Sequence, residues 1–112
     1  MTKSNTLPHH YQSLKARYPL LSDALEDLGC AVRQAGPLDS KTGQLIQLAA
    51  SAAIRSEGAV HSHTRRALEA GATAREIQHT ILLLTSTIGF PAVSAALSWV
   101  DEELQNRDKG QK

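Results

Sequence analysis

The segment from Thr73 to Ile88 constrains the fold most strongly, because it begins like a helix and is apolar on two sides. Thr73 and Glu76 have the spacing of a capping box, in which the two side chains satisfy free N–H groups at a helix start. The main apolar stripe consists of Ile77, Ile81, Leu84 and Ile88. The opposite side carries His79, Leu82, Leu83 and Ser86. A helix that is apolar on two faces needs cover on both, so in a chain this small we expect a neighbouring subunit to supply the second cover.

The rest of the chain carries alanine and leucine at helical spacing, which predicts an all-α fold without strands. Helices are expected over residues 23–35, from residue 39 to about residue 57, over residues 59–69 and 73–88, and from residue 91 to about residue 105. Asp23 with Glu26 resembles a capping box for the first helix. Asp39 is a good N-cap for the second, and Glu57-Gly58 is the expected break before the third. The stripe of the first helix is Leu21, Leu25, Leu28 and Val32.

A length of 112 residues suits one compact domain. We expect this helical domain, with five to six helices, over residues 20–105. A partly helical N-terminal arm (residues 1–19) would precede it, and a frayed polar tail (residues 106–112) would follow.

The distribution of charged and apolar residues argues against several classes of protein. The formal net charge is +1, from 12 basic and 11 acidic side chains, which gives no electrostatic footprint for nucleic acid. The stretch from Thr80 to Val100 is uncharged, but Gly89-Phe90-Pro91 interrupts it, which favours two buried helices over a membrane span. Residues 1–12 have no apolar run, so we expect no secretory signal.

Cys30 is the single cysteine and fits a reducing, cytoplasmic setting. It lies opposite the apolar stripe of its helix, which favours contact with a neighbouring subunit over a reactive thiol. A lone cysteine also supplies no zinc-site spacing, and no cofactor is expected from the sequence.

Two segments resemble a known family. Leu38-Asp-Ser-Lys-Thr-Gly-Gln-Leu-Ile46 and His63-Thr-Arg-Arg-Ala-Leu-Glu-Ala-Gly-Ala-Thr73 are similar to motifs of the carboxymuconolactone decarboxylase and alkylhydroperoxidase D-like family. Arg75-Glu76-Ile77 and Gly89-Phe90-Pro91 continue the resemblance in register, so that it covers about residues 38–100. The resemblance implies an all-α fold that assembles as a homotrimer or homohexamer. It also implies either decarboxylase or thiol-dependent peroxidase activity among relatives.

The peroxidase branch of that family uses a Cys-x-x-Cys pair, a histidine and a glutamate. The resemblance places the histidine at His63, the two cysteines at Ser56 and Ala59, and the glutamate at Gln44. Peroxide reduction needs a thiolate and a resolving thiol, which serine and alanine do not supply. Glutamine cannot exchange a proton as glutamate does. Peroxidase activity is therefore not expected.

His63 is the main candidate for a functional residue, because an imidazole titrates near neutral pH. We expect a small organic acid or lactone to bind in a pocket around it, with His63 as acid or base and with Gln44 and Ser56 as hydrogen-bonding partners. The alternative for His63 is a structural histidine that bonds Gln44 or a backbone carbonyl. Ser56 is also a preferred type of N-cap residue for the central helix.

Two other functions remain open at this point. One is a non-enzymatic helical assembly protein whose site has decayed. The other is a metal-binding protein that uses His61, His63 and His79, since imidazole suits several transition metals. His61 and His63 point nearly opposite ways on a regular helix, so a shared ion would need an irregular turn or a second subunit.

Overall fold

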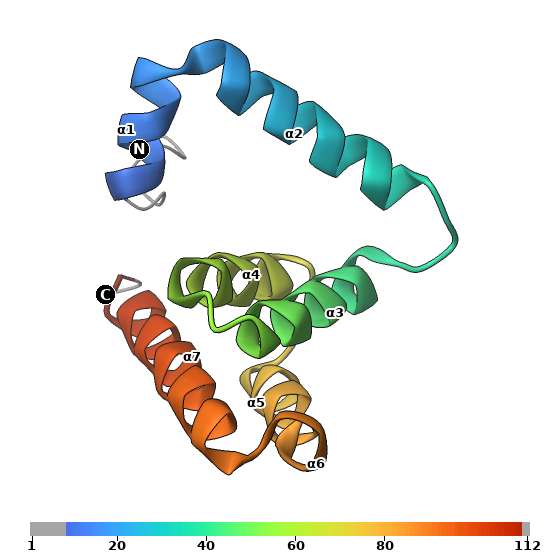
Figure 1. The fold of residues 1–112 in the computed structure, drawn as a ribbon, viewed down its shortest axis with the longest axis vertical. Helices are drawn as coiled ribbons and strands as arrows, with labels where there is room; N and C mark the ends of the chain where they lie inside the picture. Colours follow the sequence, from blue (N-terminus) through green and yellow to red (C-terminus); the bar gives the residue numbers. More distant parts are fainter. Residues whose placement is uncertain (1–8, 111–112) are drawn as a thin grey trace. The chain divides into compact units, whose positions relative to one another are not determined.

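The computed structural model describes residues 9–110, which form helices joined by short turns and contain no strand. The helices are α1 (His9–Arg17), α2 (Pro19–Gln34), α3 (Ser40–Ala53), α4 (Glu57–Glu69), α5 (Ala74–Leu82), α6 (Thr85–Ile88) and α7 (Phe90–Gly110) (Figure 1). This architecture confirms the all-α prediction. The chain divides into two compact units, of which one ends at Pro37 and the other begins at Leu38. Of the predicted N-terminal arm, residues 1–8 lie outside the described part, and α1 occupies most of the remainder.

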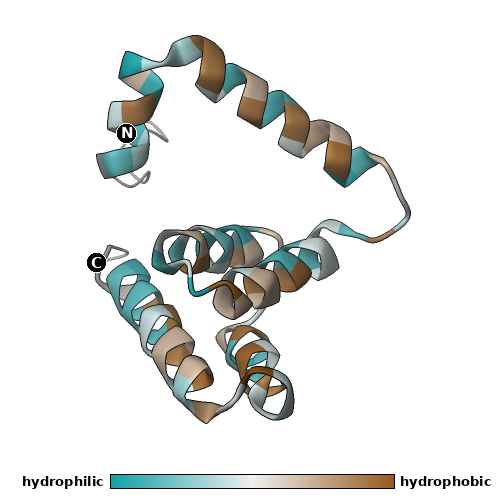
Figure 2. Cartoon of the chain, in the orientation of Figure 1, coloured by the Kyte–Doolittle hydropathy of each residue, from teal (hydrophilic) through white to brown (hydrophobic). Residues whose placement is uncertain are grey.

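In the first unit, α2 begins earlier than its sequence predicts. Pro19 stands at its first turn, where the missing proline N–H costs no hydrogen bond. The predicted capping box of Asp23 and Glu26 is therefore wrong, because both residues lie inside the helix. The Glu26 carboxylate instead accepts a hydrogen bond from the Tyr11 hydroxyl of α1 at 2.9 Å. The predicted apolar stripe is present as alternating bands along α2 (Figure 2), and Leu21, Leu25, Leu28 and Val32 are each more than half exposed.

The second unit holds the hydrophobic core. In this unit α3 packs on α4, and α7 packs on both α4 and α5 (Figure 1). The largest apolar side chains that these helices bury completely are Leu48, Val60, Ile77, Ile81, Val93 and Val100. They come from four different helices and one cluster joins them, so α3, α4, α5 and α7 are held as one body.

The turn between α3 and α4 positions the candidate site. Arg55 adopts a left-handed backbone conformation with φ 57°. The N–H of Ser56 donates to the Ser51 carbonyl and the N–H of Arg55 donates to the Ala52 carbonyl, which together form a Schellman motif. The predicted break at Glu57-Gly58 is thus wrong by two residues. Glycine is the usual residue at such a left-handed position. Because arginine stands there, the sequence does not indicate the helix end.

The segment after the Thr73 capping box also differs from its prediction. The capping box is confirmed, but the expected helix is interrupted after Leu82 and resumes as α6. The Leu84 N–H bonds the carbonyl three residues earlier, and the Thr85 hydroxyl donates to the Leu82 carbonyl. Gly89, with φ 89°, then separates α6 from α7. Helix α7 continues to Gly110, beyond the end expected near residue 105.

The capping box gives stability that should depend on pH. The Thr73 N–H and the Lys41 ammonium group both donate to the Glu76 carboxylate and lower its pKa, the backbone bond most. This contribution is present above the pKa of the unfolded chain and is lost as the pH falls below about 4. Glu76→Gln should therefore destabilise the protein near neutral pH, and less so in acid. Denaturant unfolding at both pH values measures the difference.

A matched control for this prediction is Glu69→Gln. Glu69 is exposed on α4 and forms no ion pair with the residues that the structure describes. Its substitution should change stability little at either pH. A stability loss in Glu76→Gln that is equal at both pH values would contradict the assignment of a charged capping interaction.

Candidate functional site

His63 and Gln44 form a hydrogen-bonded pair between α4 and α3. His63 Nδ1 lies 2.8 Å from Gln44 Oε1. Because an amide oxygen only accepts, Nδ1 carries the proton and donates it to Gln44, which leaves a lone pair on Nε2. Gln44 is 5% exposed and His63 is partly buried. The pair thus fixes both the ring orientation and the tautomer of His63.

Local sequence signals place these two residues opposite each other. Asp39 caps α3 by accepting a hydrogen bond from the Thr42 N–H at 2.8 Å, and the Thr42 side chain and backbone lower the pKa of Asp39. This confirms the predicted start of α3. At the other element, the Ser56 side chain accepts from the Ala59 N–H at the start of α4. The two caps therefore fix where α3 and α4 begin, and the packing of α3 on α4 brings Gln44 opposite His63.

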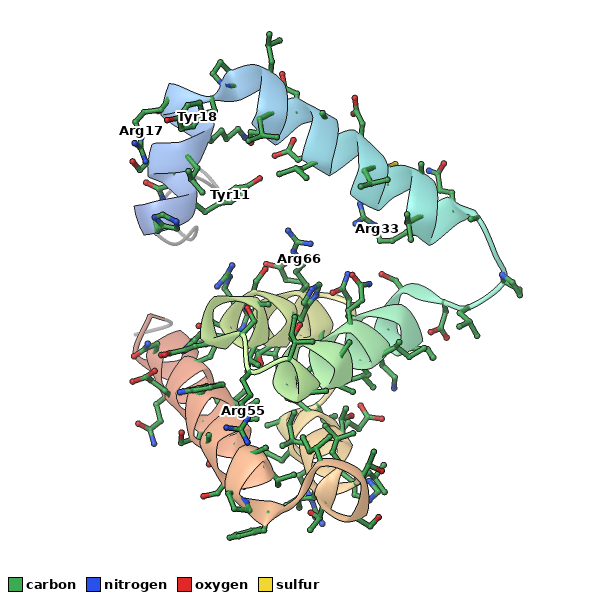
Figure 3. All side chains as sticks on the ribbon, viewed as in Figure 1. Tyr11, Arg17, Tyr18, Arg33, Arg55 and Arg66 are labelled. Carbon is green, nitrogen blue, oxygen red and sulfur yellow. The ribbon has the colours of Figure 1, made fainter. Side chains whose placement is uncertain are left out.

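The surroundings of His63 keep its imidazole neutral. Partial burial lowers the pKa of His63 most, and the positive charges of Arg66 and Arg65 lower it further. Arg66 is one helical turn after His63, so the two side chains share a face of α4. It is exposed and extends outward from α4 (Figure 3). The site thus combines a neutral histidine with a nearby cation.

Sequence reasoning missed the role of Arg66. There, Arg66 counted only toward the net charge of the chain. The spacing of three residues between His63 and Arg66 was the available signal. The structure gives the two arginines different surroundings: Arg65 is 3.8 Å from the Glu103 carboxylate, whereas Arg66 has no ion pair within the described residues.

Ser56 has a structural role in this arrangement. Its hydroxyl oxygen caps α4, and within the described part of the chain no hydrogen bond joins it to His63 or Gln44. The structure thus brings together two of the three predicted site residues. Ser56 affects the pair only indirectly, because its cap fixes where α4, the helix that carries His63, begins.

The three histidines proposed as metal ligands lie in different surroundings. His63 is bonded to Gln44, and His79 is exposed on α5. His61 is surrounded by carboxylates: its Nε2 is 3.1 Å from Glu102 and its Nδ1 is 2.8 Å from Glu103. Of these histidines, only His61 belongs to a group of side chains in the described region with the geometry of a metal site. Sequence analysis did not find this group, because Glu57 and His61 are one helical turn apart but Glu102 lies about forty residues later and reaches them only through the packing of α7 on α4.

Two further features were singled out in the sequence, the lone cysteine and the uncharged stretch. Cys30 is an exposed free thiol on α2, in the other unit. In the part of the chain that the structure describes, no helix has the length and apolar character needed to cross a membrane.

Comparison with known proteins gives a consistent family. The model of the carboxymuconolactone decarboxylase family matches residues 19–102. A family protein from Legionella pneumophila, solved in its apo form, has a similar structure, with 25% identity, a TM-score of 0.69, and coverage of 84% of this chain and 87% of that protein. A family protein from Thermotoga maritima, whose name connects it with an antioxidative response, matches at 24% identity with a TM-score of 0.67, over 92% and 91% of the two chains. No match is found among curated proteins. The match over residues 19–102 covers most of the sequence, and the chain therefore belongs to the carboxymuconolactone decarboxylase family.

Proposed function

We propose that this protein binds a small organic acid or lactone at His63. The observation that carries the proposal is the 2.8 Å hydrogen bond between His63 Nδ1 and Gln44 Oε1. It holds an imidazole in one tautomer, with the second ring nitrogen free to accept a proton or a hydrogen bond. A partly buried, neutral and oriented imidazole is suited to acid–base chemistry.

The groups around His63 indicate the class of ligand. A carboxylate would pair with the guanidinium group of Arg66, since arginine matches carboxylate geometry well. A hydroxyl group or an acidic C–H of the same ligand would face His63 Nε2, because a lone pair cannot bind a carboxylate oxygen. The Gln44 amide nitrogen has no hydrogen-bond partner among the described residues. It is therefore available to donate to a carbonyl oxygen of the ligand.

The reaction that this arrangement favours is proton transfer. His63 Nε2 would take a proton from the carbon next to a carbonyl group, which leaves an enolate and an imidazolium. Transfer of the proton from the imidazolium to a different carbon would complete an isomerisation and restore the neutral imidazole. The Gln44 amide would stabilise the enolate oxygen by donating a hydrogen bond.

We also propose that the working form is a homotrimer or a homohexamer. The apolar side chains of the second unit that remain about half exposed or more include Leu38, Ile46, Ile54, Leu82, Leu83 and Phe90. Contact with further copies would remove this apolar surface from water. The free thiol of Cys30 is compatible with the reducing conditions of the cytoplasm, where we place the protein.

A ligand screen tests the proposed function. The full chain would be heated with small carboxylates, hydroxy acids and five-membered lactones in turn, and the unfolding temperature measured. Ligands that bind the folded state raise that temperature by several degrees near saturation. We expect the strongest rises from molecules with both a carboxyl group and a hydroxyl or lactone group. If no compound raises the unfolding temperature at millimolar concentration, the non-enzymatic assembly protein becomes the better explanation.

We predict no thiol-dependent peroxidase activity. The family resemblance puts Ser56 and Ala59 at the positions of the two cysteines of the peroxidase branch, and the only thiol, Cys30, has no second thiol in the chain to resolve it. A steady-state assay with a peroxide and a dithiol reductant should therefore give background rates. Turnover that is robust in the natural protein and disappears in Cys30→Ser would contradict this prediction.

A further inference from the structure

A second group of side chains lies between α4 and α7, around His61. Its Nε2 is 3.1 Å from a Glu102 oxygen and 3.7 Å from a Glu57 oxygen. These three ligand atoms all lie within 4.8 Å of one another. Two ligands that bind one zinc ion at about 2.1 Å in tetrahedral geometry are about 3.4 Å apart. The observed spacing is therefore close to that of a metal site.

The orientation of His61 supports the same interpretation. Its Nδ1 donates to the Glu103 carboxylate at 2.8 Å, and this carboxylate is only 13% exposed. A histidine that binds a metal usually donates its other ring N–H to a carboxylate or a carbonyl, which fixes the tautomer and strengthens the ligand. Glu103 thus has the position of the outer carboxylate, and Nε2 is turned toward Glu57 and Glu102.

The net charge of the group would also favour a bound cation. Arg65 lies 3.8 Å from Glu103 and offsets that carboxylate. Among the described residues, Glu57 and Glu102 form ion pairs with His61 alone. Even a protonated His61 would leave one negative charge uncompensated, whereas a divalent ion on neutral Nε2 neutralises both carboxylates.

We propose that Glu57, His61 and Glu102 bind one divalent transition-metal ion of the zinc class. One imidazole and two carboxylates, without a thiolate, suit Zn²⁺ and its first-row neighbours better than Cu⁺, and the imidazole disfavours Mg²⁺ and Ca²⁺. Three protein ligands leave a further position for water or a ligand atom. The ion would join the first turn of α4 to α7. This site is separate from the His63–Gln44 pair and does not depend on its function.

Calorimetric titration of the chelator-treated full chain with Zn²⁺ alone tests the proposal, with Co²⁺ absorption as a second readout of ligand type. We expect one ion per chain and an increase in unfolding temperature. Glu57→Gln and Glu102→Gln should each weaken binding by about tenfold or more. Both residues are exposed, so these variants should fold, which circular dichroism checks. The matched controls Glu69→Gln and His79→Gln should bind as the natural chain does.

Two further variants test the outer carboxylate, Glu103, and the two N-terminal histidines. Glu103→Gln should weaken Zn²⁺ binding by about tenfold, since it removes the group that orients His61. A variant with His9 and His10 both replaced by glutamine should retain the site. Absence of binding at millimolar Zn²⁺ would overturn the proposal. An affinity that is unchanged in Glu102→Gln would also overturn it, as would loss of binding in the variant without His9 and His10, or equal affinity for Mg²⁺.

Discussion

Replacing His63 with alanine should weaken binding of a small organic acid by about tenfold or more. The ligand group that faces Nε2 and the Gln44 oxygen that bonds Nδ1 would both lose their hydrogen-bond partner. The same change should lower the free energy of unfolding by only about 1 kcal/mol, a common value for a point substitution. His63 is only partly buried, and the fully buried apolar core does not include it. Isothermal titration with a compound found by the screen, together with denaturant unfolding, measures the two effects.

His79→Ala is the matched control for this prediction. His79 is an exposed histidine on α5, and its replacement should leave both binding and stability nearly unchanged. Equal affinity in the natural chain and in His63→Ala would place the ligand elsewhere. A His63→Ala chain that does not fold would show instead that the Gln44 contact is structural.

The purified protein should have a molecular mass of at least three chains at low micromolar concentration. Leu82, Leu83 and Phe90, which lie at or near the ends of α5 and α7, are 47%, 64% and 63% exposed. Apolar side chains gathered on one region of a surface mark a site of association. Light scattering coupled to size exclusion gives the mass directly.

A charge placed in this region should break the assembly. We expect Leu83→Glu to shift the protein to smaller species, because the carboxylate would have to be buried unpaired. Thr87→Glu places the same group at an exposed polar position of α6 and should leave the mass unchanged. A natural chain that is monomeric and stably folded at micromolar concentration would contradict the prediction.

Local signals in the sequence predicted several helix boundaries correctly. Asp39, Ser56 and Thr73 each cap a helix as their side-chain chemistry favours, and each accepts a backbone N–H within its own first turn. These interactions span three residues and need no information from the rest of the fold. The contact of His63 with Gln44 was also open to prediction, through the family resemblance.

Features that depend on tertiary contacts could not be read in this way. The left-handed conformation of Arg55 is stabilised by the hydrogen bonds to the Ser51 and Ala52 carbonyls at the end of α3. An arginine side chain does not favour this conformation, so the residue type does not predict it. The helix is likewise interrupted after Leu82, although its apolar stripe continues and predicts one unbroken helix. His61 meets Glu102 and Glu103 only because α4 packs on α7. Helical periodicity gives the face of each residue, but not which helix covers that face.

The most direct test of the proposed site is the ring state of His63 near neutral pH. Long-range proton–nitrogen correlation spectra of the protein labelled with ¹⁵N-histidine distinguish the two tautomers. We expect a protonated Nδ1 and a free Nε2 at His63, with Gln44→Leu removing this preference. Addition of a carboxylate or lactone identified by the screen should then shift the Nε2 signal of His63 and leave that of His79 unchanged. A proton on Nε2 in the free protein, or a ligand that leaves the His63 signals in place, would contradict the assignment of His63 as the binding group.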